Sequence, residues 1–150
     1  MRSLAACALA VALAGAACSA PGPAPLDTKN ESCAWCRMAV SDRRFAAQLV
    51  APSEDPRFFD DIGCLANYLR SKHDLPSGAR AYVTDHLTHA WVEAGAAVYT
   101  RVEGLETPMG SHLLAHADAA LRARDAEAKG GQPLSATEVF GPGLPFGRGK

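Results

Sequence analysis

Arg57-Phe-Phe-Asp-Asp-Ile-Gly-Cys-Leu-Ala-Asn-Tyr-Leu69 is the stretch that decides the fold. Its first three residues predict a short strand, because aromatic side chains are favoured in strands. Either Asp60 or Asp61 can then cap a helix, since a carboxylate accepts bonds from the free N–H groups of a first helical turn. The apolar residues that follow recur at helical spacing and predict one buried helix face: Ile62, Leu65, Ala66 and Leu69.

The segments around this stretch predict further strands and helices. Residues 45–50 read as a strand, and the polar turn at 51–56 joins them to residues 57–59 as a hairpin. Further strands are predicted at 81–84, 91–93, 96–102 and 111–115. Residues 118–129 have a helical pattern that Gly130-Gly131 would stop, and residues 134–140 predict a strand or a turn before a helix.

Strands followed by a helix and another strand occur twice, which predicts an α+β fold of two pseudo-repeated ββαβ units packed into one small domain. Met38 is expected to open the first unit and Met109 the second. No fixed residue period supports the repeat, so it rests on the order of elements alone.

Cys33-Ala-Trp-Cys-Arg-Met38 carries the chemistry of the chain, with two thiols and a thioether in six residues. A Cys-x-x-Cys pair alone fits a disulfide, a redox couple, half a zinc site or a copper site. Met38 favours copper, because soft donors prefer Cu(I) and zinc sites are normally built from Cys, His and carboxylate. The alternative is that Met38 is an ordinary core side chain. Trp35 could shield a metal from water or simply pack.

Composition excludes several classes of function. The chain has 150 residues, 15 Lys plus Arg and 16 Asp plus Glu, so one domain is expected and no basic surface for nucleic acid. We find no nucleophile–base pattern and no phosphate-binding loop, which argues against an enzyme. Four histidines, His86, His89, His112 and His116, are each expected to be inert, with His112 the best ligand candidate because it follows Met109 closely.

The N-terminus predicts a secreted, anchored protein. Residues 1–17 resemble a signal peptide, with Arg2 before an apolar run that is too short to span a membrane. Cys18 follows Gly-Ala-Ala, as in a bacterial lipobox, and would be lipidated; ordinary cleavage with a stray Cys18 is the alternative. Residues 18–30 would then form a Pro-rich tether. Residues 31–140 form the domain, and the Gly- and Pro-rich residues 141–150 predict a disordered tail.

Four motifs in order resemble the NosL family. They are Cys36-Arg-Met38, Phe59-Asp-Asp-Ile-Gly-Cys-Leu-Ala-Asn-Tyr-Leu69, Ala90-Trp-Val-Glu93 and Thr107-Pro-Met-Gly-Ser111. The resemblance implies a periplasmic lipoprotein, accessory to nitrous oxide reductase, that binds one Cu(I) and passes it on through an ABC-type membrane transporter complex. It also implies two related ββαβ units, and an anchor that is expected in the outer membrane.

The resemblance implies that Cys36, Met38 and Met109 are the copper ligands. Cys33 departs from the family motif and could be a further ligand, or could pair with Cys36 or Cys64 in an oxidising periplasm. Cys64 lies on the predicted amphipathic helix, where a buried, unreactive thiol is expected. Met109 could equally fill a gap in the core, but Pro108 and Gly110 flank it and would aim its side chain.

Two other functions remain open from the residues. One is a periplasmic thiol–disulfide oxidoreductase that uses Cys33 and Cys36, for which the motif should lie between a strand and a helix. The other is a lipoprotein with a structural zinc site.

Overall fold

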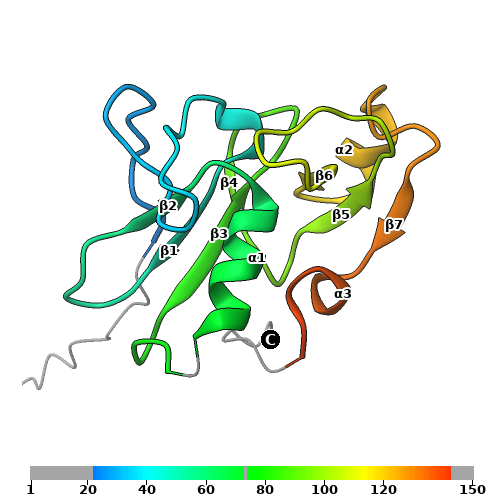
Figure 1. The fold of residues 1–150 in the computed structure, drawn as a ribbon. Helices are drawn as coiled ribbons and strands as arrows, with labels where there is room; N and C mark the ends of the chain where they lie inside the picture. Colours follow the sequence, from blue (N-terminus) through cyan, green and yellow to red (C-terminus); the bar gives the residue numbers. More distant parts are fainter. Residues whose placement is uncertain (1–21, 73, 143–150) are drawn as a thin grey trace, which may run out of the picture.

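The structure, a computed structural model, describes residues 22–72 and 74–142. The predicted signal peptide, Cys18 and most of the predicted tail lie outside these residues. Two antiparallel sheets and three α-helices make up a mixed α and β domain (Figure 1). The predicted fold class is therefore confirmed at this level.

The first sheet has the strand order β2-β1-β3-β4. Its strands are β1 (Ala47–Val50), β2 (Arg57–Phe59), β3 (Arg80–Thr84) and β4 (Trp91–Glu93). β1 pairs with both β2 and β3, with Ala47 opposite Phe59 on one side and Val83 on the other. The predicted hairpin is confirmed. The strand starts later than predicted, because Asp42 caps a 3-10 turn, η1 (Arg43–Phe45), that takes up Phe45.

Helix α1 (Ile62–Ser71) packs on this sheet through the apolar face predicted from the sequence. Ile62, Leu65, Ala66 and Leu69 are all buried. Asp61 is the capping residue, and its carboxylate accepts a bond of 2.6 Å from the Gly63 N–H. The strand β2 therefore passes directly into the helix, with Asp60 and Asp61 at the junction (Figure 1).

The second sheet has the order β6-β5-β7, with β5 (Val98–Arg101), β6 (Leu113–His116) and β7 (Gln132–Leu134). Helix α3 (Ala136–Phe140) follows β7 and begins in a capping box between Ser135 and Glu138. It contacts α1, so one apolar core runs from the first sheet through α1 to Tyr99 and Phe140.

Two details of the second half differ from the prediction. The helix predicted over 118–129 is α2 (Ala119–Arg124), and it ends early because Asp125 turns its carboxylate toward two buried histidines. Met109 does not open the second unit. It lies in the connection between β5 and β6, whereas Met38 precedes β1, so the two methionines are not in equivalent positions.

Candidate metal centre

The Cys-x-x-Cys segment forms a tight loop between Ser32 and Ala39, which pair as an isolated antiparallel bridge. The Cys33 N–H donates to the Met38 carbonyl at 2.8 Å, and the Arg37 N–H donates to the Cys33 carbonyl at 3.0 Å. A further bond of 2.8 Å from the Ala34 N–H to the Phe58 carbonyl ties the loop to the end of β2. These bonds bury Cys33 completely and leave Cys36 partly exposed.

Four side chains converge beneath this loop, and we call them the thiol cluster: Cys33, Cys36, Asp60 and Cys64. One ligand atom from each lies within 4.8 Å of all the others. All three cysteines are free thiols. The Cys36 thiol donates to the Asp60 carboxylate, with Sγ–O distances of 3.3 and 3.4 Å. Three thiols and one carboxylate around one small volume are a donor set that can hold a metal ion.

The cluster favours one thiolate in the absence of metal, and that thiolate is Cys33. A hydrogen bond from the Cys64 thiol lowers the pKa of Cys33 to about 6, against the opposing effect of burial, and the Cys36 and Asp60 N–H groups assist. A bond donated to the charged form of an acid always stabilises that form. An anionic sulfur is therefore present at neutral pH, ready to attract a cation.

The other two thiols stay protonated under the same conditions. Burial raises the pKa of Cys36 to about 11, helped by the neighbouring Cys33 sulfur and Asp60 carboxylate. The pKa of Cys64 is raised as well, first because its thiol donates to Cys33 and then because it is buried. Metal binding at Cys36 or Cys64 would therefore release protons.

Met109 is positioned by Asp61, the same residue that caps α1. The Asp61 carboxylate accepts from the Met109 N–H at 3.0 Å and from the Thr107 hydroxyl at 2.7 Å. Ser111 of the same loop packs against Gly63, where an added Cβ would lie 2.8 Å from the Ser111 Cβ. The loop between β5 and β6 is therefore held against the first turn of α1.

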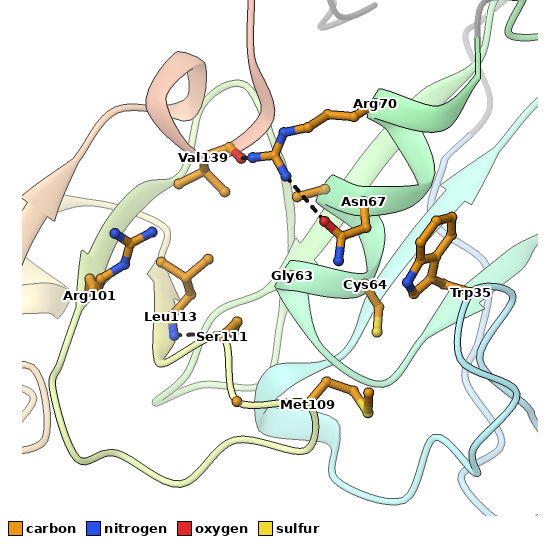
Figure 2. Close-up of a pocket in the computed structure, with 12 residues that line it drawn as sticks. Trp35, Gly63, Cys64, Asn67, Arg70, Arg101, Met109, Ser111, Leu113 and Val139 are labelled. Atoms are coloured by element: carbon orange, nitrogen blue, oxygen red, sulfur yellow. Dashed lines mark hydrogen bonds between the residues drawn. The ribbon is translucent and has the colours of Figure 1, made fainter.

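A pocket of about 280 Å³ opens where this loop meets α1. Trp35, Cys64 and Met109 all line it, so a residue of the thiol cluster, the Cys-x-x-Cys loop and the predicted methionine share one cavity. Figure 2 shows the sulfur atoms of Cys64 and Met109 on the side of the pocket where the Trp35 indole lies. The structure thus brings Met109 next to the cluster, although the two segments are far apart in the sequence.

Met38 is the predicted ligand that the structure leaves most exposed. It is 61% exposed, against 48% for Met109, so neither methionine fills a gap in the core. Met38 is in the same loop as Cys33 and Cys36 and closes it through its carbonyl. His112 is not a member of the thiol cluster; its Nδ1 lies 2.6 Å from the Leu105 carbonyl.

A family model matches residues 23–141, and the family is NosL. The chain belongs to the NosL family. The match covers most of the chain and confirms the resemblance found in the sequence. NosL proteins are accessory copper-binding proteins of the periplasm or extracellular space. No curated protein matches the chain with significant similarity. Among the helices that the structure describes, none is both long and apolar enough to cross a membrane.

The sequence alone leaves the role of Cys64 open and does not assign Asp60 to the thiol cluster. Asp60 was assigned only a capping role, but Asp61 is the cap and Asp60 faces the Cys36 sulfur. Cys64 was correctly expected to be buried, yet it faces Cys33 and not merely the apolar core. The sequence does contain a signal for both. Asp60 lies just before the predicted helix and Cys64 lies in its first turn, so the two are near each other. Both also follow the predicted strand 57–59, which could contact the Cys-x-x-Cys loop.

Proposed function

We propose that this chain is a periplasmic Cu(I)-binding lipoprotein, and not an enzyme, that delivers copper for maturation of a copper enzyme, nitrous oxide reductase being our candidate. The observation that carries the proposal is the convergence of three thiols in the thiol cluster, one of which, Cys64, lines the same pocket as Met109. Thiolate and thioether are the donors that Cu(I) prefers. Membership of the NosL family supports the same conclusion.

The proposed ligands are Cys36, Met38 and Met109, with Cys33 as a further thiolate. Cys36 is partly exposed and both methionines are exposed, whereas Cys33 is buried. Copper would therefore be held between the buried Cys33 thiolate and an exposed rim of Cys36, which loses its proton on binding, and the two neutral thioethers. A ligand from a partner protein can approach from the rim and bind the copper before the buried thiolate dissociates from it. This arrangement suits a carrier that must bind tightly and still release its cargo.

The partners we propose are the receiving apo-enzyme or an ABC-type membrane transporter complex. The exposed side chains of Trp35, Met38 and Met109 would face such a partner. An exposed methionine adapts its shape to different surfaces, which suits a contact that forms only during transfer.

The test is metal analysis of the full chain after anaerobic purification, followed by Cu(I) titration against a chelator. We expect one tightly bound Cu(I) per chain. Cys36→Ser should weaken binding by at least tenfold. Cys18→Ser is the matched control, since it changes a cysteine outside the proposed site and should leave the affinity unchanged. Equal affinity in the Cys36→Ser and Cys18→Ser proteins would contradict the proposal.

A structural zinc site is the second candidate, and the Asp60 carboxylate favours it. Zn²⁺ accepts a donor set of three thiolates and one carboxylate, whereas Cu(I) has little preference for oxygen. Such a site would contain Zn²⁺ as purified, and a chelator would lower the melting temperature sharply. Asp60→Asn separates the two candidates, because it should weaken zinc binding and leave Cu(I) binding by the sulfurs largely intact.

Thiol–disulfide exchange is a third candidate, because the pKa of Cys33 is lowered to about 6. Two observations argue against it. Cys33 is fully buried, and the motif lies in a loop before η1 and β1 and not at the start of a helix. Catalytic turnover in a disulfide-reduction assay, lost in Cys33→Ser, would favour this function over copper delivery.

We also propose that the fold contains a repeated ββαβ unit. The elements β1-β2-α1-β3 and β5-β6-α2-β7 have the same order, and in each unit the first strand pairs with both the second and the third. The helices differ, because α1 has a buried face and α2 has no buried residue.

A further inference from the structure

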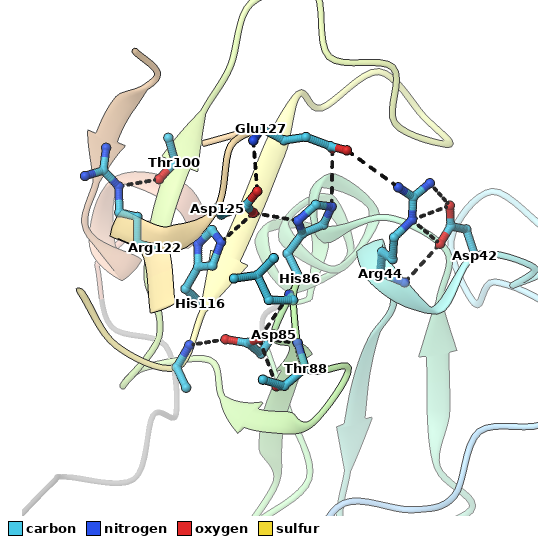
Figure 3. A network of polar contacts seen from close by, with 12 residues as sticks. Asp42, Arg44, Asp85, His86, Thr88, Thr100, His116, Arg122, Asp125 and Glu127 are labelled. Carbon is cyan, nitrogen blue, oxygen red and sulfur yellow. Dashed lines mark hydrogen bonds and ion pairs between the residues drawn. The ribbon is translucent and has the colours of Figure 1, made fainter. Parts of the chain in front are cut away.

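A second group of buried polar side chains lies away from the thiol cluster, and we call it the histidine cluster: His86, His116 and Asp125. His86 follows β3, His116 ends β6, and Asp125 follows α2. They are 5%, 0% and 5% exposed. One ligand atom from each lies within 4.8 Å of the others, and Figure 3 shows both rings directed at the same carboxylate.

A single oxygen of Asp125 contacts both rings. Its Oδ2 lies 2.7 Å from Nδ1 of His86 and 2.8 Å from Nε2 of His116. If both rings are neutral and donate to this oxygen, Nε2 of His86 carries no proton and can act only as an acceptor. That nitrogen lies 3.5 Å from Oε2 of Glu127, another acceptor. Two acceptors that face each other are unfavourable, and the His86 nitrogen is buried, so the arrangement is incomplete without a cation or a further proton.

The outer nitrogens have no hydrogen-bond partner within the part of the chain that the structure describes. Both Nε2 of His86 and Nδ1 of His116 are buried and unpaired. Glu127 is at ion-pair distance from His86, but without hydrogen-bond geometry. Polar groups this deeply buried are usually satisfied, so pairing both rings with Asp125 alone leaves the cluster incompletely satisfied.

We propose that the histidine cluster binds a divalent cation of the Zn²⁺ class. The ligands are Nδ1 of His86, Nε2 of His116 and the Asp125 carboxylate, with a fourth position for water. Zn²⁺ takes imidazole and carboxylate ligands, at about 2.0–2.2 Å. Ligand atoms around a tetrahedral ion therefore lie about 3.3 Å apart, so the two rings need only move back slightly from Asp125.

Glu127 supplies the carboxylate that the second nitrogen of a metal-bound histidine requires as a hydrogen-bond acceptor. A metal-bound histidine normally donates its other N–H to a carboxylate, which fixes the ring and its tautomer. With the metal on Nδ1, the proton of His86 moves to Nε2 and points at Glu127 Oε2. The repulsive pair of acceptors becomes a hydrogen bond, and one of the two unpaired nitrogens is satisfied.

The charges around the site favour a cation. Asp125 places a buried carboxylate between the two rings. Asp85 adds a second buried carboxylate in the same polar network (Figure 3). Arg44 lies 4.0 Å from Glu127, but its guanidinium is already paired with Asp42 at 2.8 Å.

A cation at this site would join the two sheets. β3 belongs to the first sheet and β6 to the second, and the His86 N–H already donates to the Ala115 carbonyl at 2.9 Å. Asp125 brings the end of α2 to the same point. The two metal sites share no residue, and their donors differ: soft sulfur in one, imidazole and carboxylate in the other. One chain can therefore hold Cu(I) and a harder divalent ion at once.

The test uses the full chain, reduced and first loaded with one equivalent of Cu(I) to occupy the thiols. Co²⁺ is then titrated as a coloured substitute for Zn²⁺, and Zn²⁺ is titrated in parallel. We expect one further equivalent to bind, with weak visible ligand-field bands and no intense thiolate-to-cobalt band. Bound Zn²⁺ should also raise the melting temperature, because it binds the folded state alone.

Three substitutions localise the second metal. His116→Gln and Asp125→Asn should each weaken Co²⁺ binding by more than 100-fold, and Glu127→Gln should weaken it about 10- to 100-fold. His89→Asn is the matched control. His89 is an exposed histidine close to His86 with a φ of 59°, which Asn tolerates, and its loss should leave the affinity unchanged.

The proposal is overturned if the Cu(I)-loaded chain binds no further Co²⁺ or Zn²⁺, which would mean that the cluster holds only protons. It is equally overturned if the bound Co²⁺ shows an intense thiolate band. His116 is fully buried, so His116→Gln could fail to fold. The spectrum of the unaltered chain and the exposed Glu127→Gln variant decide the question in that case.

Discussion

The adjacent carboxylates of Asp60 and Asp61 have different partners, although they are one residue apart. Asp60 and Asp61 are both buried, but Asp61 is the helix cap, with an extended backbone and φ of −146°. Its oxygens are used by the Gly63, Thr107 and Met109 donors. Asp60, one residue earlier, faces the Cys36 sulfur. The sequence predicted a capping carboxylate but could not say which of the two it was.

At the scale of single residues, Met109→Leu tests the proposed thioether ligand. Leu keeps the volume and apolarity of the side chain and deletes the sulfur, and the site is 48% exposed, so little stability should be lost. We expect weaker Cu(I) binding in a competition titration with a chelator, and a melting temperature of the metal-free protein that stays within a few degrees of the original.

The matched control for Met109→Leu is Trp35→Phe. Trp35 lines the same pocket but offers no sulfur, so its change should alter the affinity less. If Met109→Leu binds Cu(I) as tightly as the unaltered chain, Met109 is not a ligand and Cys33 becomes the third donor.

A sequence motif groups only candidate residues that are close in the chain. Cys33, Cys36 and Met38 are found by the motif because a six-residue loop keeps them together whatever the rest of the fold does. Cys64 and Asp60 join them only because the Ala34 N–H binds the end of β2 and α1 starts three residues later. The histidine cluster is built from three separate segments of the chain, and no spacing of residues predicts it.

At the scale of elements, the first turn of α1 connects the thiol cluster to the loop that carries Met109. Asp61→Ala removes a helix cap, worth about 1 kcal/mol, and leaves the Thr107 and Met109 donors without their acceptor. We expect a loss of about 2–4 kcal/mol in the free energy of unfolding, measured by denaturant titration, together with weaker Cu(I) binding because the Met109 loop is released.

Asp118→Ala provides the comparison for Asp61→Ala. Asp118 caps α2 through one bond of 2.7 Å to the Leu121 N–H and is more exposed. Its loss should cost about 1 kcal/mol and leave copper binding unchanged. Equal costs for the two substitutions would show that Asp61 acts as a cap alone.

The contact between α1 and the Met109 loop makes a second prediction at this scale. Ala in place of Gly normally stabilises a helix by about 1 kcal/mol. At Gly63, however, the new Cβ would lie 2.8 Å from the Ser111 Cβ and 3.1 Å from an Asp61 oxygen. We expect Gly63→Ala to destabilise the protein by about 1–2 kcal/mol, because overpacking outweighs propensity. Asn67→Ala, on an exposed face of the same helix, should change stability by less than about 0.5 kcal/mol. A more stable Gly63→Ala protein would show that the loop is free to move.

Elements were predicted well where local pattern decides and less well where distant contacts decide. The buried face of α1 follows from helical spacing alone, and it was correct. The pattern of 118–129 is equally helical, but α2 ends at Arg124 because Asp125 bonds to His86 and His116 from other elements. The same contact that shortens the helix builds the histidine cluster, and sequence periodicity contains no information on it.

At the scale of the whole molecule, the predicted tether is shorter than its sequence suggests. Ala24 is held to β1 by two bonds with the buried Gln48 side chain, at 2.8 and 3.1 Å. Leu26 also packs against the core. If Cys18 carries a lipid, the number of residues between Cys18 and Ala24 sets the greatest distance from the lipid to the domain. A chain of that length spans at most about 20 Å.

An anchor this short would hold the domain close to the membrane, where a transporter complex could reach the copper site. We expect Cys18→Ser to release the protein from sedimenting membranes into the soluble periplasmic fraction, with its Cu(I) affinity unchanged. Gln48→Leu is the informative second variant. It removes the two bonds to Ala24 and should leave the protein in the membrane fraction, because the lipid and not the docking contact provides attachment. Sedimentation of the Cys18→Ser protein with membranes would contradict the anchor, and release of the Gln48→Leu protein would show that attachment passes through the domain.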